Sequence, residues 1–294
     1  MSKGRKNSQD RRTGQDSEDR SRGRRRRRDP DAPATPLRRS PRSYEDESRR
    51  VIYVASEGQK TERDYIALLN AAYGDREGRK FQLKFCAAGR GLRPTETVDH
   101  VLAAATGPED EKWVLFDRDT EDKRDDDIPE AMREAAKHGV QVALSHPSFE
   151  LWLLLHFQQF SSQEGGRSAT ILDRLRKHRD AKGFEEYDRQ SGDRGKGLDG
   201  QRGQSLLGEE KTAVRNARKL VGLCPYGDCS PKEADHSPIP GPDTESYQAW
   251  TRRTGHAAGC DPLRRDPSSD VWRLLVGLGI GTEDSGDTGY PGRP

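Results

Sequence analysis

Short apolar runs alternate with amphipathic stretches along residues 50–157. The runs are rich in Val, Ile, Leu and Phe and too apolar to lie half exposed, so they predict strands buried on both faces. They cover residues 51–55, 81–87, 113–116 and 140–144. Helical spacing of apolar residues predicts helices at 61–73, 95–102, 128–137 and 149–157. Strands that alternate with helices predict an α/β fold, with a mostly parallel sheet flanked by helices on both faces.

Caps and loops refine this pattern. Thr95 is predicted to cap the second helix, and Ser268 or Ser269 a last helix at 270–278. Further helices are predicted at 168–179 and 209–220. Residues 192–204, rich in Gly and charge, predict a mobile loop, and residues 224–267 carry little periodic pattern. We expect four regions: a disordered Arg-rich arm (1–48), an α/β core (49–160), a helical and loop-rich extension (161–280) and a disordered tail (281–294).

Charge is unevenly distributed along the 294 residues. Residues 1–50 hold 17 Lys and Arg against 9 Asp and Glu, whereas residues 51–294 hold 35 Lys and Arg against 41 Asp and Glu. The arm contains an unbroken basic block of Arg24, Arg25, Arg26, Arg27 and Arg28. Such a block binds nucleic-acid phosphates, with an affinity that falls steeply with salt, or it serves only as a solubilising leader.

Composition excludes several classes of protein. No run approaches the ~18–20 apolar residues that span a bilayer, and the polar N-terminus has no apolar segment typical of a secretory signal. We therefore expect a cytoplasmic protein that does not enter a membrane. Gly195-Lys196-Gly197 lacks the Walker pattern and has no strand before it, so no ATPase site is predicted.

Four cysteines are too few for a disulfide scaffold in a chain of this length. Cys224 and Cys229 precede His236, His256 and Cys260, which raises the alternative of a zinc site. Because the spacing is irregular, we expect free thiols, at the surface or half-buried, at these positions instead.

Acidic residues follow two of the predicted strands. Glu57 comes after the first, and Asp117 and Asp119 come after the third. Strand alternation directs both Asp side chains to one side and Arg118 to the other. Carboxylates this close repel each other unless a cation neutralises them, and oxygen ligands suit Mg²⁺ or Mn²⁺. The carboxyl ends of parallel strands meet at one edge, so Glu57, Asp117 and Asp119 predict a metal site there. The alternative is a polar loop at a strand end.

Two polar residues interrupt the apolar helix at 149–157. Glu150 is interpreted as a further metal ligand or as a carboxylate that accepts from backbone N–H groups at the start of the helix. His156 is a candidate functional residue, although a lone His on an apolar helix is more often a satisfied core residue.

Three further charged residues have two interpretations each. Lys60 and Glu62 lie one turn from Glu57 and can approach substrate or metal. Glu62 can equally be an acidic residue at the helix N-terminus that interacts favourably with the helix dipole. Arg90, within Gly89-Arg90-Gly91, follows the second strand and presents its side chain to a phosphate or forms part of a turn.

Four blocks of sequence together resemble the RloB-like family. They are Ser56-Glu57-Gly58-Gln59-Lys60-Thr61-Glu62 with Tyr65, Phe116-Asp117-Arg118-Asp119, the segment 145–157, and Asp266-Pro267-Ser268-Ser269-Asp270-Val271. The last has Asp266 where the family has Asn. The resemblance is strong over 50–157, weaker over 205–280, and does not include the arm.

The resemblance implies a function. The family is encoded near restriction–modification genes, and its core resembles a Toprim domain, the magnesium-binding module of topoisomerases, primases and OLD-type nucleases. It implies that Glu57 is the general acid or base and that Asp117 and Asp119 are metal ligands. We therefore expect Mg²⁺- or Mn²⁺-dependent cleavage of DNA or RNA in bacterial anti-phage defence, with an ATPase, a restriction complex or a second copy as candidate partners. The alternatives are a non-catalytic accessory protein and another Toprim reaction, such as nucleotidyl transfer or strand passage.

Overall fold

The computed structural model describes residues 49–76, 80–107, 110–119, 125–189 and 193–282. The predicted arm with its Arg24–Arg28 block lies outside these residues, as does most of the predicted tail. Within them, no helix combines the length and the apolar character that crossing a membrane requires.

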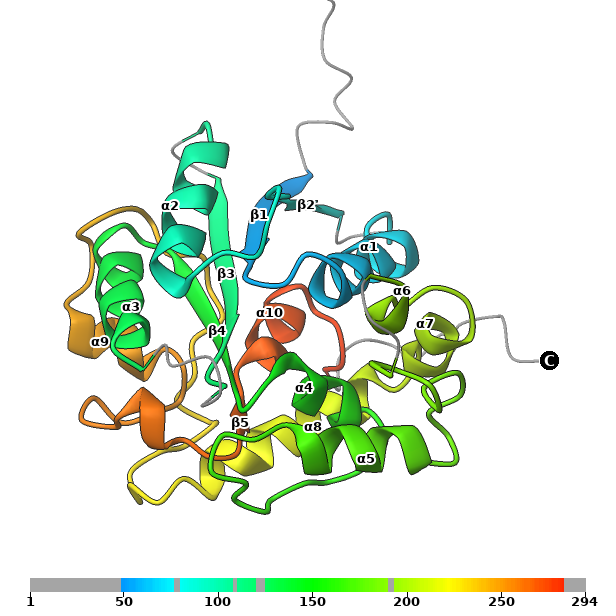
Figure 1. Ribbon diagram of the computed structural model, residues 1–294. Coiled ribbons are helices and arrows are strands. Elements are labelled where there is room, and N and C mark those ends of the chain that lie inside the picture. The colour runs from blue at the N-terminus through cyan, green and yellow to red at the C-terminus, as the bar shows by residue number, and fades with distance from the viewer. Residues whose placement is uncertain (1–48, 77–79, 108–109, 120–124, 190–192, 283–294) are drawn as a thin grey trace, which may run out of the picture. The chain divides into compact units, whose positions relative to one another are not determined.

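Five strands form one sheet in the order β2-β1-β3-β4-β5 (Figure 1). The strands are β1 (Arg50–Ser56), β2 (Phe81–Phe85), β3 (Glu111–Asp117), β4 (Gln141–His146) and β5 (Ser268–Ser269). The first four run parallel, and β5 pairs antiparallel with β4. The mostly parallel sheet predicted from the apolar runs is confirmed.

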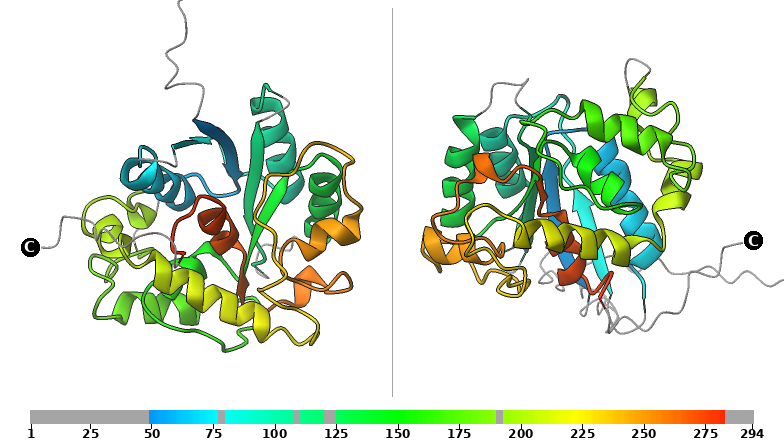
Figure 2. Two further views of the ribbon diagram at one scale, coloured as in Figure 1. Left: turned by 180° about the vertical axis from the view of Figure 1, so that it is seen from behind. Right: turned by 90° about the horizontal axis from the view of Figure 1, so that it is seen from below.

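Helices cover both faces of this sheet (Figure 2). One face carries α2 (Pro94–Ala104), α3 (Asp127–Lys137) and α9 (Tyr247–Arg252). The other carries α1 (Thr61–Tyr73), α4 (Phe149–Leu155) and α10 (Val271–Gly277), and beyond them α5 (Ala169–Lys177) and α8 (Glu210–Gly222). Val54 belongs to the core of the second face and Ala55 to that of the first. Because neighbouring residues of one strand enter different cores, the run has to be apolar throughout.

Two predicted helix caps are wrong. α2 begins at Pro94, and Glu96 accepts a hydrogen bond from the Arg93 N–H at 3.0 Å. A proline suits the first helical position because its missing N–H has no partner there anyway. Ser268 and Ser269 form β5 instead of capping α10, and the Asp270 N–H donates to Leu144 O at 2.9 Å. Pairing with the sheet therefore takes precedence over local capping chemistry.

The loop predicted at 192–204 is also partly wrong. It contains two short helices, α6 (Asp193–Lys196) and α7 (Gln201–Leu206). Arg202 donates hydrogen bonds to Gly183 O at 2.6 Å and Gly197 O at 2.8 Å. A charged side chain in this Gly-rich stretch thus satisfies one carbonyl within the stretch and one 19 residues away, contacts that local composition does not reveal.

Candidate functional site

The carboxyl ends of the parallel strands bring the predicted acidic residues to one edge of the sheet. β1 ends at Ser56, immediately before Glu57, and the Glu57 N–H donates to Leu115 O of β3 at 3.2 Å. β3 ends at Asp117, whose partner in β4 is Ser145. Because β1 and β3 are neighbours, Glu57 and Asp117 lie at the ends of adjacent strands. Asp119 lies two residues further on and is half-buried.

Asp117 is surrounded by other carboxylates. Burial raises the pKa of Asp117 well above its usual value, and the charges of Glu62, Glu150 and Glu57 raise it further. The Phe149 N–H, at the start of α4, donates to the Asp117 carboxylate and acts in the opposite direction. A carboxylate in this position is costly to ionise unless a positive charge is close by.

Glu62 lies in the first turn of α1 and is 8% exposed. The Gly58 N–H donates to its carboxylate, and a Cβ at Gly58 would overlap the carboxylate oxygens. A larger residue at this position would therefore displace the Glu62 carboxylate. Burial, together with the charge of Glu150, raises the pKa of Glu62 from 4.5 to about 7. The carboxyl group can hold or release a proton near neutral pH.

Glu150 is buried in the first turn of α4. The Tyr187 hydroxyl donates to Glu150 Oε1 at 3.1 Å, and Lys196 Nζ lies 3.6 Å from the same oxygen. Thr61 Oγ1 lies 2.8 Å from the Tyr187 hydroxyl and donates to Lys196 O at 2.9 Å. The contacts of Glu150 therefore include side chains that are distant from it in the sequence.

Lys196, at the end of α6, was not among the residues predicted from sequence. Its Nζ lies 3.6 Å from Glu150 and 3.6 Å from Asp188. Burial acts to lower the pKa of Lys196, but the charges of these two carboxylates, together with those of Glu62 and Asp117, outweigh it and the pKa is raised. Leu198 N–H donates to Asp64 Oδ2 of α1 at 3.1 Å, which holds the residues after α6 against α1. The Gly195-Lys196-Gly197 triplet distinguishes this position in the sequence, but only tertiary contacts bring Lys196 close to Glu150.

Two other predicted residues make ion pairs at this end of the sheet. Lys60 Nζ lies 3.0 Å from Asp64 Oδ2, and the exposed Arg90 lies 2.6 Å from Glu96. Their roles toward a substrate stay predictions.

His156 is buried among aromatic rings of α1 and α4. Its Nδ1 lies 3.0 Å from Trp152 O, and its Nε2 lies 3.3 Å from the Tyr65 hydroxyl. Since a carbonyl only accepts, Nδ1 carries the proton and Nε2 accepts from Tyr65. Burial lowers the pKa of His156 to about 4. These contacts fit the interpretation as a satisfied core histidine.

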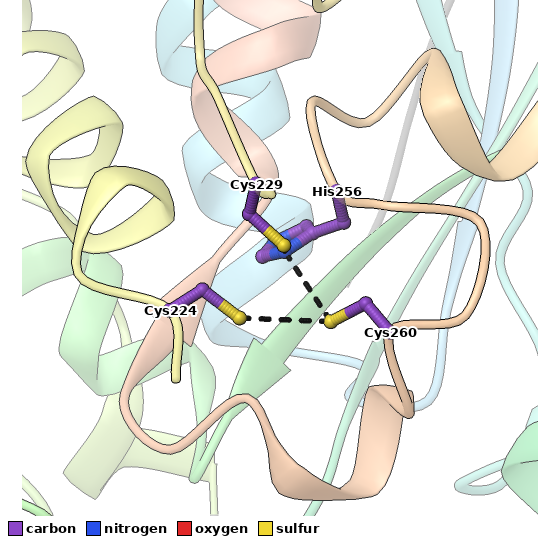
Figure 3. Close-up of side chains that lie close together, drawn as sticks. All are labelled: Cys224, Cys229, His256 and Cys260. Atoms are coloured by element: carbon purple, nitrogen blue, oxygen red, sulfur yellow. Dashed lines mark hydrogen bonds between the residues drawn. The ribbon is translucent and has the colours of Figure 1, made fainter. Parts of the chain in front are cut away.

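The four cysteines form no disulfide, but Cys229 and Cys260 are buried, contrary to the expected surface or half-buried position, and three of the four lie together. Donor atoms of Cys224, Cys229, His256 and Cys260 lie within 4.8 Å of one another (Figure 3). His236 instead packs against Trp272. In the part of the chain that the structure describes, these four side chains form the group close enough together to hold a metal ion. The irregular spacing had argued against this arrangement, and the fold overcomes it by bringing two loops together.

A basic cavity of about 940 Å³ lies along α8. Four cationic side chains of that helix line it: Lys211, Arg215, Arg218 and Lys219. Arg218 is half-buried and the other three are exposed. Such a surface favours an anionic partner.

Fold and site together define an α/β protein with buried carboxylates at the carboxyl edge of a parallel sheet. The family model described as RloB-like protein matches residues 52–228, and the chain belongs to this family. The match includes the three blocks that begin at Ser56, Phe116 and Ser145 and ends before the block at 266–271. No curated protein matches the chain. No solved structure does either.

Proposed function

We propose that this protein is a Mg²⁺- or Mn²⁺-dependent nuclease of the Toprim type, which cleaves phosphodiester bonds of DNA or RNA in anti-phage defence. One observation carries the proposal. In a member of the RloB-like family, Asp117 ends a central strand beside the carboxylates of Glu57, Glu62 and Glu150, and their charges raise its pKa. Clustered carboxylates at a sheet edge are costly unless a cation neutralises them.

The donor chemistry fits a hard divalent cation. Glu57, Asp117 and Asp119 would hold it, and Glu150 would be a further ligand or anchor. Carboxylate oxygens are the preferred ligands of Mg²⁺ and Mn²⁺. Bound there, the ion would offset the negative charge of the phosphate and of the leaving group.

The chain's own side chains would supply the remaining chemistry. Glu57 would be the general acid or base, as the family resemblance implies. Glu62, with a pKa of about 7, can hold or release a proton at neutral pH. Lys196 bears a positive charge beside Glu150, and Lys60 bears another one turn from Glu57. Both are suited to orient a phosphate, which binds to ammonium groups as point charges.

Binding of the nucleic acid would rest on basic residues elsewhere in the chain. The cationic side chains along α8 are candidate phosphate contacts, as is the exposed Arg90. The Arg24–Arg28 block would add a contact that strengthens binding at low salt. None of these contacts requires a particular base sequence.

The test is a cleavage assay with plasmid DNA, single-stranded DNA and tRNA, each with Mg²⁺, with Mn²⁺ and with chelator. Wild type is compared with Glu57→Gln and Asp119→Asn, and with Asp99→Asn, which changes an exposed acid on α2. We expect metal-dependent cleavage by wild type and the control and none by the two site variants. Circular dichroism confirms that all four proteins are folded.

Two results would change the conclusion. Cleavage retained by Glu57→Gln or Asp119→Asn would remove the site from the mechanism. If every folded form binds Mg²⁺ but cleaves nothing, even with an ATPase or restriction complex present, the protein is an accessory module that binds nucleic acid or a defence complex.

A further inference from the structure

Two loops far from each other in sequence meet at the cysteine group. Cys224 and Cys229 follow α8, while His256 and Cys260 lie between α9 and the short 3₁₀ helix Pro262–Arg264. The four side chains point toward one another (Figure 3). Cys229, His256 and Cys260 are buried, and Cys224 is half-buried.

The distances within the group match those around a tetrahedral zinc ion. Zinc–sulfur bonds of ~2.3 Å and zinc–nitrogen bonds of ~2.0–2.1 Å place tetrahedral ligands ~3.6–3.8 Å apart. Cys224 Sγ lies 3.6 Å from Cys260 Sγ. His256 Nδ1 lies 3.4 Å from Cys229 Sγ and 3.7 Å from Cys260 Sγ. These three distances thus have the spacing of a zinc ligand set, and all four donor atoms lie within 4.8 Å of one another.

The orientation of His256 supports the same conclusion. Its Nε2 is buried without a hydrogen-bond partner and lies 3.8 Å from Asp270 Oδ1, which also has none. A carboxylate on this side favours the proton on Nε2 and leaves the lone pair of Nδ1 free to face the sulfurs of Cys229 and Cys260. Metal-ligating histidines commonly have this arrangement, with a carboxylate behind the ring.

Backbone and charge around the group are suited to thiolates. The Ala257 N–H donates to Cys229 Sγ at 3.3 Å. Arg265, 2% exposed, donates to Cys260 O at 3.3 Å and lies 3.7 Å from Asp270. Zinc with three thiolates and a neutral imidazole carries a net charge of −1, and a buried guanidinium next to it would offset that charge.

We propose that Cys224, Cys229, His256 and Cys260 form a structural zinc site, with His256 bound through Nδ1. All four ligand positions come from the protein, so the site is closed and leaves no position for a substrate. It is separate from the carboxylate site and does not depend on the nuclease activity.

Neither alternative accounts for all four residues. A Cys224–Cys260 disulfide needs sulfurs ~2.05 Å apart. It would also not explain why Cys229 and His256 lie beside these two sulfurs. Reduced cysteines can pack as small apolar side chains. Apolar packing, however, does not explain a buried imidazole nitrogen directed at two of the sulfurs, or a buried carboxylate behind the ring.

The site would stabilise a segment with little apolar patterning. Residues 224–267 are rich in Pro, Gly, Asp and Ser, and a metal can supply the folding free energy that a small apolar core does not. The segment leads directly into β5, which pairs with His146 and Ser145 at the end of β4. Ser145 is in turn the partner of Asp117 in β3. Zinc would thus support the edge of the sheet that carries the carboxylates.

The experiment measures metal in untagged, full-length protein by mass spectrometry, together with its free thiols. We expect about one zinc per chain in wild type, none in Cys229→Ser or Cys260→Ser, and unchanged zinc in Cys86→Ser. Cys86 is a buried cysteine outside the group and serves as the matched control. Wild type refolded with Co²⁺ should show the visible bands of tetrahedral cobalt and a sulfur-to-cobalt charge-transfer band. The cobalt spectrum uses wild type alone and therefore decides the question even if the variants do not fold.

Three outcomes would overturn the proposal. In the first, wild type contains no metal and gives no tetrahedral cobalt spectrum. In the second, Cys229→Ser retains zinc, and in the third, denatured protein has two free thiols instead of four, which reveals a disulfide. Loss of cleavage activity with zinc still bound would bear on the nuclease proposal alone.

Discussion

The Tyr187 hydroxyl donates a hydrogen bond of 3.1 Å to Glu150 Oε1 and lies 2.8 Å from Thr61 Oγ1. This contact joins α4 to α1 through a residue that stands outside every predicted element. Both Tyr187 and Glu150 are buried, so the carboxylate depends on the phenol for part of its solvation.

Tyr187→Phe should therefore destabilise the protein by about 1–3 kcal/mol, because it removes a donor from a buried carboxylate. Urea denaturation measures the free energy of unfolding. Tyr247→Phe, which changes a tyrosine 37% exposed, is the matched control and should change it little. Equal effects of the two substitutions would show that the Glu150 contact contributes nothing.

Asp117→Asn should abolish metal-dependent cleavage and yet raise the melting temperature of the metal-free protein. The amide removes a charge that Glu62, Glu150 and Glu57 oppose. Mg²⁺ should raise the melting temperature of wild type and not that of the variant. Differential scanning fluorimetry with and without Mg²⁺ measures both effects, with Asp99→Asn as control. A lower melting temperature of the metal-free variant would contradict the predicted repulsion.

Lys196→Gln should lower kcat for cleavage by roughly a hundredfold, as expected when a charge that stabilises a phosphate is removed. Mg²⁺ binding should persist, since Lys196 is not a ligand. Lys182→Gln, on an exposed side chain in the same region, should cleave normally. Steady-state kinetics of both variants separate kcat from KM. A changed KM with unchanged kcat would mean that Lys196 only helps to bind the substrate.

The buried His156 should make the free energy of unfolding depend on pH. Its folded pKa of about 4 lies below the usual 6.5, so between these values the unfolded chain binds a proton that the folded chain does not. Its contribution to stability is therefore present above about pH 6.5 and is lost as the pH falls toward 4, by roughly 3 kcal/mol. His156→Asn should be less stable than wild type at pH 7, and the difference should shrink on acidification. Denaturation of both proteins from pH 7 to 4.5 measures it. A difference that does not change with pH would contradict the assignment.

The basic residues of α8 should contribute to salt-dependent binding. Replacing Lys211, Arg215 and Lys219 together with Gln should weaken binding of duplex DNA and reduce the dependence of log Kd on log salt, by about 0.9 for each phosphate that the protein no longer neutralises. Arg133→Gln changes an exposed cation of α3, across the sheet, and is the control. Fluorescence anisotropy over a salt series provides the slopes. Identical slopes for the α8 variant and wild type would exclude this surface from binding.

Most elements of the α/β core could be predicted from the sequence. The run at 113–116 could hardly be anything but a buried strand, and β3 spans Glu111–Asp117. Gly139, two residues after the last residue of α3, has a φ of 64°. These signals are local: the period of apolar residues, and a glycine where the backbone needs positive φ. The predictions at Thr95 and Ser268 failed because capping preferences are weak next to a favourable proline or a strand pairing.

The site was predictable only in part. Glu57 and Asp117 lie at the ends of buried strands, and parallel strands end at one edge, so sequence alone led to both residues. Lys196 and Tyr187 carry no such signal, because each approaches Glu150 only through tertiary contacts.

The sequence by itself determined the parallel sheet, the order of its first elements and the acidic residues at the strand ends, because burial of apolar strands and their direction are encoded locally. Only the tertiary structure decided which distant residues surround those acids, and that Cys224 and Cys229 meet His256 and Cys260. Such contacts depend on how loops close over the core. Loop closure is governed by packing and long-range hydrogen bonds, which leave no periodic trace in the sequence.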